Sequence, residues 1–244
     1  MQQQTEALEG LEIKGIDQAL MFRVFYGFAA VALLSLIILA GGHWLSRVLS
    51  RGGYTEDTTP REVVIGNNVL SVPSNAIRFG SARRDGEADQ LDLYLHWPDM
   101  KGYTAATRAD FNDVGGKKDI LFLTFAPRRM PLDMSARFDP IYRLLVVEPA
   151  TSGENGLTFY TFKADTGYAD EMLAVAKRPG KPPFVARCLT GVAAAQSLAP
   201  CERDIAVGDR LTLLYRFPEN LLGSWRQLDE AVMQTARSYL TRAN

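Results

Sequence analysis

The longest uninterrupted apolar stretch of the chain covers residues 24–42, and it contains no Asp, Glu, Lys or Arg. As an α-helix that rises about 1.5 Å per residue, this stretch spans roughly 28 Å, close to the roughly 30 Å hydrocarbon core of a bilayer. A core helix of a soluble protein normally carries a polar stripe, whereas Ser35 is the only polar side chain in residues 29–40. The pattern therefore predicts a transmembrane helix over residues 23–46.

An export signal that is cleaved is the main alternative to a retained anchor. Small residues at Ala40, Gly41 and Gly42 would suit a signal peptidase. However, four acidic residues and only one lysine, Lys14, precede Arg23, whereas a signal peptide begins with a short basic region. We therefore predict that the helix is retained and that residues 1–22 form a short cytoplasmic tail.

Alternation of apolar and polar residues dominates the chain after residue 61. Residues 62–73 place Gly66, Asn67 and Asn68 between two β-branched runs, and these residue types tolerate the positive φ angles of a tight hairpin. In residues 89–98, leucines alternate with polar and aromatic side chains, as in a strand with one buried face. Further strands are predicted at residues 119–127, 144–149, 157–164, 184–189 and 209–218.

Three of these strands share a pattern. Residues 89–98, 119–127 and 209–218 each begin with Asp, carry Leu at the third and fifth positions and end with Pro. A duplicated unit would produce this pattern. Chance would also produce it, because turn Asp residues, apolar alternation and strand-ending Pro residues are each common. Both explanations stay open.

Helical periodicity appears at the end of the chain. Between residues 221 and 239, apolar residues recur every three or four positions, which is the period of an amphipathic helix. We expect its Trp225 stripe to pack on a sheet, which makes the fold class α+β, with a β-rich, mainly antiparallel domain and a C-terminal amphipathic helix. Residues 47–61 show no periodicity and are predicted to be a linker, so the domain covers residues 62–244.

The two cysteines, Cys188 and Cys201, are the main guide to the compartment. Their separation is too large for a CxxC redox motif, and two further ligands of a structural zinc site are missing. We predict a disulfide, with two unrelated free thiols as the alternative. A disulfide implies an oxidising compartment, so the domain is expected in the bacterial periplasm. The basic residues that flank the apolar stretch give no clear orientation by themselves.

Charge and motif content exclude several classes of function. The chain holds 27 basic and 28 acidic residues, mixed without long runs of one sign, so no nucleic-acid partner is expected. The sequence contains no GxSxG, GxxxxGK[ST] or GxGxxG motif. Its two histidines, His43 and His96, lie too far apart in the sequence to suggest a metal site. No catalytic residue, metal or cofactor is therefore predicted.

Two segments suit the binding of a partner. The candidate partner-binding residues are His96, Trp97, Tyr103, Arg128 and Arg129. The first three begin a long connection over residues 96–118, and long connections are often functional. The two arginines directly follow a strand, where an anionic partner can bind. The structural alternatives are a solvated histidine at a strand end, a helix over residues 103–111 that packs Tyr103 and Phe111 into the core, and a solvated turn.

The sequence as a whole favours a structural or interaction protein of the bacterial cell envelope. We expect a single-pass inner-membrane protein that contacts membrane lipid through its N-terminal helix and binds an envelope protein through its periplasmic domain. The alternatives are an envelope enzyme that acts on cell-wall glycan or lipid through carboxylates and, if the orientation is reversed, a sensor domain that faces the cytoplasm.

Overall fold

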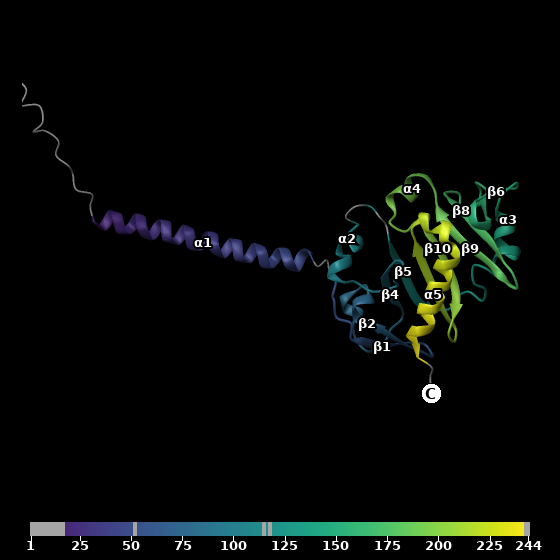
Figure 1. The fold of residues 1–244 in the computed structure, drawn as a ribbon, viewed down its shortest axis with the longest axis horizontal. Coiled ribbons are helices and arrows are strands. Elements are labelled where there is room, and N and C mark those ends of the chain that lie inside the picture. Colours follow the sequence, from purple (N-terminus) through teal and green to yellow (C-terminus); the bar gives the residue numbers. More distant parts are fainter. Residues whose placement is uncertain (1–17, 51–52, 114–115, 117–118, 242–244) are drawn as a thin grey trace, which may run out of the picture. The chain divides into compact units, whose positions relative to one another are not determined.

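The computed structural model describes the chain except for both ends and short internal segments. The described residues are 18–50, 53–113, 116 and 119–241. They belong to two compact units, Met1–Gly52 and Gly53–Asn244. All the strands belong to the second unit, and Figure 1 shows them with the chain coloured along its sequence.

The first unit contains one long helix, α1, over Gln18–Ser50. The helix predicted at residues 23–46 lies within these bounds. In the part of the chain that the structure describes, no helix has both the length and the hydropathy of a membrane span. Residues 1–17 of the predicted tail lie outside the described residues.

The second unit begins with a small sheet. Its strands, in spatial order, are β12 (Leu240–Thr241), β2 (Asn68–Pro73), β1 (Pro60–Ile65) and β3 (Gly86–Glu87). The predicted hairpin is confirmed, because β1 and β2 pair antiparallel from Ile65 and Asn68 outward. Gly66 turns the chain with a φ of 57°, which glycine adopts without strain.

A larger antiparallel sheet makes up most of the domain. Its eight described strands, in spatial order, are β4 (Leu91–His96), β5 (Ile120–Pro127), β11 (Leu211–Phe217), β10 (Cys201–Val207), β9 (Lys181–Leu189), β8 (Glu171–Arg178), β7 (Leu157–Thr161) and β6 (Thr151–Ser152). The three strands that share the Asp-to-Pro pattern are the neighbours β4, β5 and β11.

Helical segments are short except for the last one. The α-helices of the domain are α2 (Arg108–Phe111), α3 (Arg143–Leu145), α4 (Gly191–Gln196) and α5 (Trp225–Tyr239). Tighter or wider turns form η1 (Ser74–Ala76), η2 (Gly80–Ala82), η3 (Ala105–Thr107), η4 (Phe138–Tyr142), η5 (Glu154–Gly156) and η6 (Glu219–Ser224).

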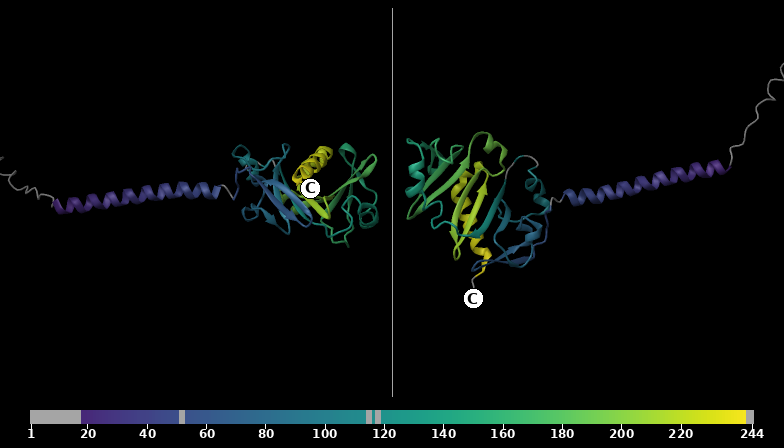
Figure 2. Two further views of the ribbon diagram at one scale, coloured as in Figure 1. Left: turned by 90° about the horizontal axis from the view of Figure 1, so that it is seen from below. Right: turned by 180° about the vertical axis from the view of Figure 1, so that it is seen from behind.

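The predicted C-terminal helix is confirmed as α5, which lies over one face of the large sheet (Figures 1 and 2). Its stripe of Trp225, Leu228, Val232 and Ala236 is buried and belongs to the main core of the domain. The ring of Trp225 lies 4.9 Å from that of Phe184 on β9, measured between centroids. The domain is therefore α+β, as its sequence pattern indicates.

Strands β8 and β9 are buried on both faces. Ala174 and Phe184 face the main core, whereas Leu173, Val175 and Val185 face a second core that lies against η4. A strand with two buried faces shows no alternation of apolar and polar residues. This explains why β8 was not predicted from the sequence.

The strand predicted at residues 144–149 is wrong. Residues 144 and 145 belong to α3, which directly follows η4, and Val146 makes a single bridge to Phe162. Phe138, Tyr142 and Val146 are buried, while Leu144 is 68% exposed. Phe138 and Tyr142 are four residues apart and lie on one side of a helical turn, whereas Val146 is already extended, so the predicted strand is reduced to one bridge.

The predicted disulfide is confirmed. Cys188 on β9 and Cys201 on β10 are bonded to each other, and they are directly opposite in the register of the two strands. Both cysteines are fully buried in the main core. The disulfide closes the loop that contains α4, whose residues 191–196 carry mostly small side chains.

Beyond a short stretch of backbone pairing, the junction between β9 and β10 is made by side-chain contacts. In the described chain, the two strands have two register pairs, Cys188 with Cys201 and Arg187 with Glu202. Farther along, Arg203 of β10 donates a hydrogen bond of 2.9 Å to the backbone oxygen of Val185, and Ser135 donates one of 2.6 Å to that of Pro183. The large sheet therefore consists of two halves that meet along a seam, where short backbone pairing is followed by side-chain hydrogen bonds.

Candidate partner-binding site

His96 and Trp97 are largely engaged within the domain. The His96 side chain is 16% exposed, with Nδ1 2.9 Å from Asp99 Oδ1 and Nε2 3.3 Å from Asp110 Oδ2. Both ring nitrogens therefore have a carboxylate neighbour. Trp97 is partly buried and packs against the main core. Neither side chain presents a large free surface to a partner.

Tyr103 belongs to a buried aromatic cluster. It is 4% exposed, and its ring stacks on that of Tyr54 at 4.7 Å between centroids. Phe111, at the end of α2, is also buried and meets the Tyr103 ring edge-on at 5.4 Å. The connection after β4 therefore includes the short helical packing that its sequence suggested as a structural alternative.

Arg128 and Arg129 lie far from His96. His96 pairs with Ile120 at the start of β5, whereas the arginines follow Pro127 at its end. Eight residues of an extended strand measure about 25 Å, so the two predicted groups do not form one site. Arg129 is exposed and Arg128 partly buried, and the backbone N–H of Arg128 donates to the backbone oxygen of Arg210 at 2.7 Å.

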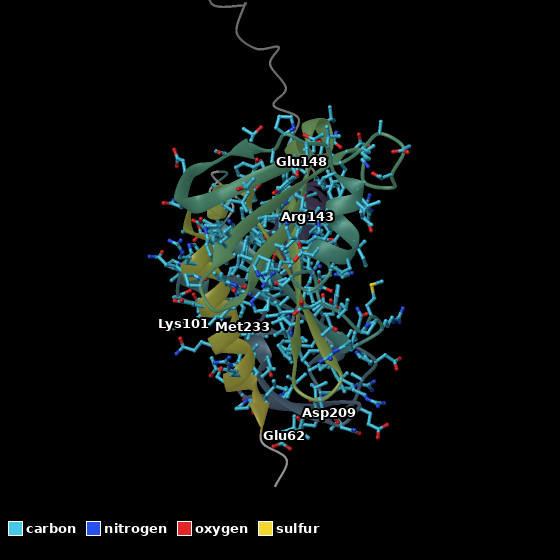
Figure 3. The ribbon with its side chains drawn as sticks, turned by 90° about the vertical axis from the view of Figure 1, so that its right-hand side faces the viewer. Glu62, Lys101, Arg143, Glu148, Asp209 and Met233 are labelled. Carbon is cyan, nitrogen blue, oxygen red and sulfur yellow. A yellow bond between two sulfur atoms is a disulfide. The ribbon has the colours of Figure 1, made fainter. Side chains whose placement is uncertain are left out.

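The β8–β9 hairpin is flanked by two pockets of similar size. One, of about 720 Å³, lies between the hairpin and α5, and the other, of about 760 Å³, lies between the hairpin, β7 and η4. Figure 3 labels one lining residue of each, Met233 on α5 and Arg143 on α3. The residues that line both pockets are Lys177, Arg178, Pro179, Lys181 and Arg226. We call the two pockets together the hairpin site.

The hairpin site is rich in positive charge. Six basic and three acidic residues line it. Asp139 is paired with Arg143 at 3.0 Å, and Asp229 is paired with Arg178 at 2.6 Å. The remaining basic residues, Lys177, Lys181, Arg226 and Arg237, are exposed, and none of them forms an ion pair within the described part of the chain. Glu230 is the remaining acid, so the site carries excess positive charge.

A tight turn places Lys177 and Lys181 close together. Arg178 and Lys181 are opposite each other at the end of the hairpin, with Pro179 and Gly180 between them. Gly180 has a φ of 66°, which fits a turn with proline followed by glycine. The Arg178 side chain closes this turn, because its Nε donates to the backbone oxygen of Pro182 at 2.6 Å.

Asp229 fixes the hairpin to α5 and to the seam of the sheet. Its carboxylate accepts hydrogen bonds from Arg178 at 2.6 Å, Arg203 at 3.0 Å and the Tyr215 hydroxyl at 2.9 Å. Burial raises the pKa of Tyr215 well above its ordinary value, so the hydroxyl stays protonated and donates. Burial lowers the pKa of Arg178, and the charge of Asp229 acts against that shift.

The adjacent acids Asp229 and Glu230 are poorly placed for joint acid–base chemistry. Neighbouring positions of a helix do not face each other, and Asp229 already accepts three hydrogen bonds. A glycosidase needs two carboxyl groups that face one bond. The described residues also include no group of three or more metal-ligating side chains. The hairpin site thus combines exposed, unpaired basic side chains with acids that do not face each other.

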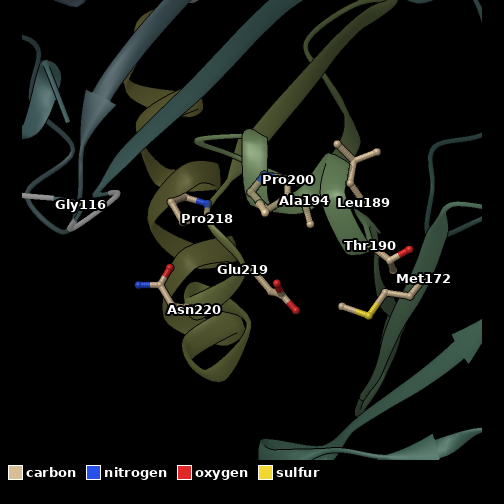
Figure 4. A pocket seen from close by; sticks show the side chains of 11 residues that line it. Gly116, Met172, Leu189, Thr190, Ala194, Pro200, Pro218, Glu219 and Asn220 are labelled. Carbon is tan, nitrogen blue, oxygen red and sulfur yellow. The ribbon is translucent and has the colours of Figure 1, made fainter.

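A further pocket, of about 630 Å³, lies beside the disulfide-closed loop. Leu189, Thr190, Ala194 and Pro200 line it, and Figure 4 shows the Glu219 carboxylate and the Met172 side chain projecting into the same space. Its walls are mostly small or apolar, and they carry no basic side chain. This pocket therefore lacks the charge that distinguishes the hairpin site.

The sequence did not reveal the hairpin site because its residues come from separate parts of the chain. Lys177 and Lys181 belong to one hairpin, whereas Arg226 belongs to α5. The one local signal was the run of residues 177–183, which places three basic side chains around a Pro-Gly turn. Only the pairing of β8 with β9 and the packing of α5 bring these residues together.

Comparisons with known proteins show a shared fold. No protein-family model matches the sequence, and no curated protein matches it significantly. An immunity protein of the Stenotrophomonas maltophilia type IV secretion system is similar in structure, with a TM-score of 0.51 and 13% identity over 76% of this chain and 94% of that one. The iron-regulated outer membrane lipoprotein FrpD of Neisseria meningitidis gives a TM-score of 0.45 and 9% identity, over 77% and 95% of the two chains.

Proposed function

We propose that this chain is a single-pass inner-membrane protein of the bacterial envelope, and that its domain binds another envelope protein from the periplasmic side. The apolar stretch at residues 24–42 supports an anchor. The buried disulfide between Cys188 and Cys201 supports an oxidising compartment for the domain. The fold that the domain shares with an immunity protein of a secretion system is in keeping with an envelope role.

The observation that carries the binding role is the hairpin site. Four exposed basic side chains without a paired acid surround two pockets whose walls are held in place by Asp229. Like charges that face solvent at one place repel each other, and a partner of opposite charge relieves that repulsion. An envelope enzyme that acts through carboxylates is less favoured, because the acids of this site are paired or separated.

Crosslinking of the intact protein in whole cells tests the binding role. A membrane-permeant crosslinker, followed by purification of the full-length chain, is expected to give one dominant adduct with a second envelope protein at constant stoichiometry. The unmodified chain without crosslinker serves as the control. Only self-adducts, or no adduct above background, would contradict the proposal.

A second measurement tests the anchor. N-terminal sequencing of the protein from the membrane fraction is expected to find Met1 or Gln2, because the acidic leader does not suit a signal peptide. Extraction at alkaline pH should leave the protein in the membrane pellet, as expected for a spanning helix. A mature chain that begins at His43 would show that the apolar stretch is a cleaved signal.

A further inference from the structure

We propose that the hairpin site binds one acidic segment of the partner protein, which lies across the β8–β9 hairpin and occupies both pockets. This inference rests on the proposed function and specifies the chemistry of the partner. Lys177, Lys181 and Arg226 line both pockets, so the positive charge is concentrated where the pockets meet. The acidic part of the segment is therefore expected over the hairpin.

The walls of the two pockets define what flanks the acidic part. The pocket beside α5 is lined by Trp225 and Met233, and the pocket beside η4 by Phe138, Tyr160 and Val175. Apolar side chains that line a pocket beside charged groups offer contact surface to apolar side chains of a ligand. We infer that apolar residues of the segment enter the pockets on either side of its acidic centre.

The basic groups are partly pre-positioned. The Arg226 guanidinium lies 4.9 Å from the centroid of the Trp225 ring, on which it stacks. The turn at Pro179 and Gly180 and the side chain of Arg178 hold the end of the hairpin. A site whose groups are already ordered loses less conformational entropy on binding. This favours recognition of a particular segment over loose attraction of any anion.

An acidic protein segment fits the site better than other polyanions do. Nucleic acids need many phosphate contacts along a basic stripe, but this chain has a net charge of -1 with both signs mixed. The site has a margin of mixed charge, because Glu230 lines it beside the basic residues, and this carboxylate would repel a continuous array of phosphates. A protein segment can carry acidic residues at some positions and other residues between them, so it can complement a margin of mixed charge.

Site-specific photocrosslinking of the full-length protein in cells tests this inference. A photoreactive residue is placed at position 181, which lines both pockets, at 237, which lines the pocket beside α5, and at 143, which lines the pocket beside η4. All three positions are expected to crosslink to one short stretch of the same partner protein. Peptide mass spectrometry should show an excess of Asp and Glu in that stretch.

Charge reversal tests the contribution of the basic side chains. Lys177→Glu combined with Arg226→Glu should lower the yield of the adduct from position 181 by about tenfold or more, because complementary charge controls the encounter. The matched control is Arg84→Glu with Lys101→Glu, two exposed basic residues that line neither pocket. The control changes the net charge equally and should leave the yield and the melting temperature unchanged.

The outcomes separate this inference from the proposed function. If chemical crosslinking captures a partner but positions 181, 237 and 143 do not react with it, the binding role stands and the hairpin site is wrong. A crosslinked stretch that is basic or uncharged, or adducts with nucleic acid or lipid, would overturn the acidic-segment proposal. Equal losses in the charge-reversal variant and its control would do the same. A failure of chemical crosslinking to find any partner would reject the proposed function first.

Discussion

Replacement of Asp229 by asparagine is expected to lower the free energy of unfolding by about 3–5 kcal/mol, since it removes one partner of a buried ion pair. Arg203 is 1% exposed and donates to Asp229 at 3.0 Å. An asparagine keeps the size of the side chain but leaves the Arg203 charge buried without a counter-charge. The amide also keeps only one of the two acceptor oxygens that Arg178, Arg203 and Tyr215 use, and its NH2 group takes the place of the other.

Urea unfolding of the full-length protein in detergent, followed by tryptophan fluorescence, measures this loss. Glu230→Gln is the matched control, because it makes the same chemical change at an exposed neighbouring position and is expected to stay within about 0.5 kcal/mol. Tyr215→Phe should cost less, about 1–2 kcal/mol, because it removes one neutral donor. A loss below about 1 kcal/mol for Asp229→Asn would show that the Arg203 charge has another compensation.

Removal of the disulfide is expected to have the second largest effect. The double variant Cys188→Ala, Cys201→Ala should lose about 2–5 kcal/mol, because the closed loop no longer restricts the unfolded chain. The two cysteines are 13 positions apart and fully buried, so some of the loss comes from packing.

A reductant distinguishes the disulfide from the packing effect. Dithiothreitol should lower the urea midpoint of the natural protein and leave that of the double variant unchanged. Alkylation without reductant in cells is expected to leave both cysteines unmodified. If the reductant has no effect on the natural protein, the bond does not contribute to its stability.

The sequence predicted β4, β5, β11 and α5 but not β10, where Arg203 occupies a buried position between Cys201 and Ile205. β4, β5 and β11 were found because leucines at every second position pack on the main core while most of the positions between them are less buried. α5 was found because its stripe has the helical period. β8 was missed because both of its faces are buried, and residues 144–149 were misassigned because a short apolar run has no length over which its period can be read.

The candidate site was harder to predict than the fold. Arg128 and Arg129 were noticed because they are adjacent in the sequence, whereas Lys181 and Arg226 are brought together only by the packing of α5 on the sheet. Tyr103 was selected as an aromatic residue in a long connection, but it stacks on Tyr54 in a region that is distant in sequence. Proximity of this kind depends on tertiary structure, which local patterns do not encode.

The seam between β9 and β10 bears on how the domain responds to a mechanical load that is applied at the hairpin. The half of the sheet that carries the hairpin site, β9 to β6, is joined to the other half by the disulfide between Cys188 and Cys201, by short backbone pairing and by the hydrogen bond from Arg203 to Val185. Asp229 lies on α5 and binds both Arg178 of the hairpin and Arg203 of β10, so its carboxylate links the hairpin to the C-terminal helix and to the other half of the sheet. We therefore expect a pull on the hairpin to load the disulfide and the ion pairs of Asp229 together, in addition to the packing of Phe184 on Trp225.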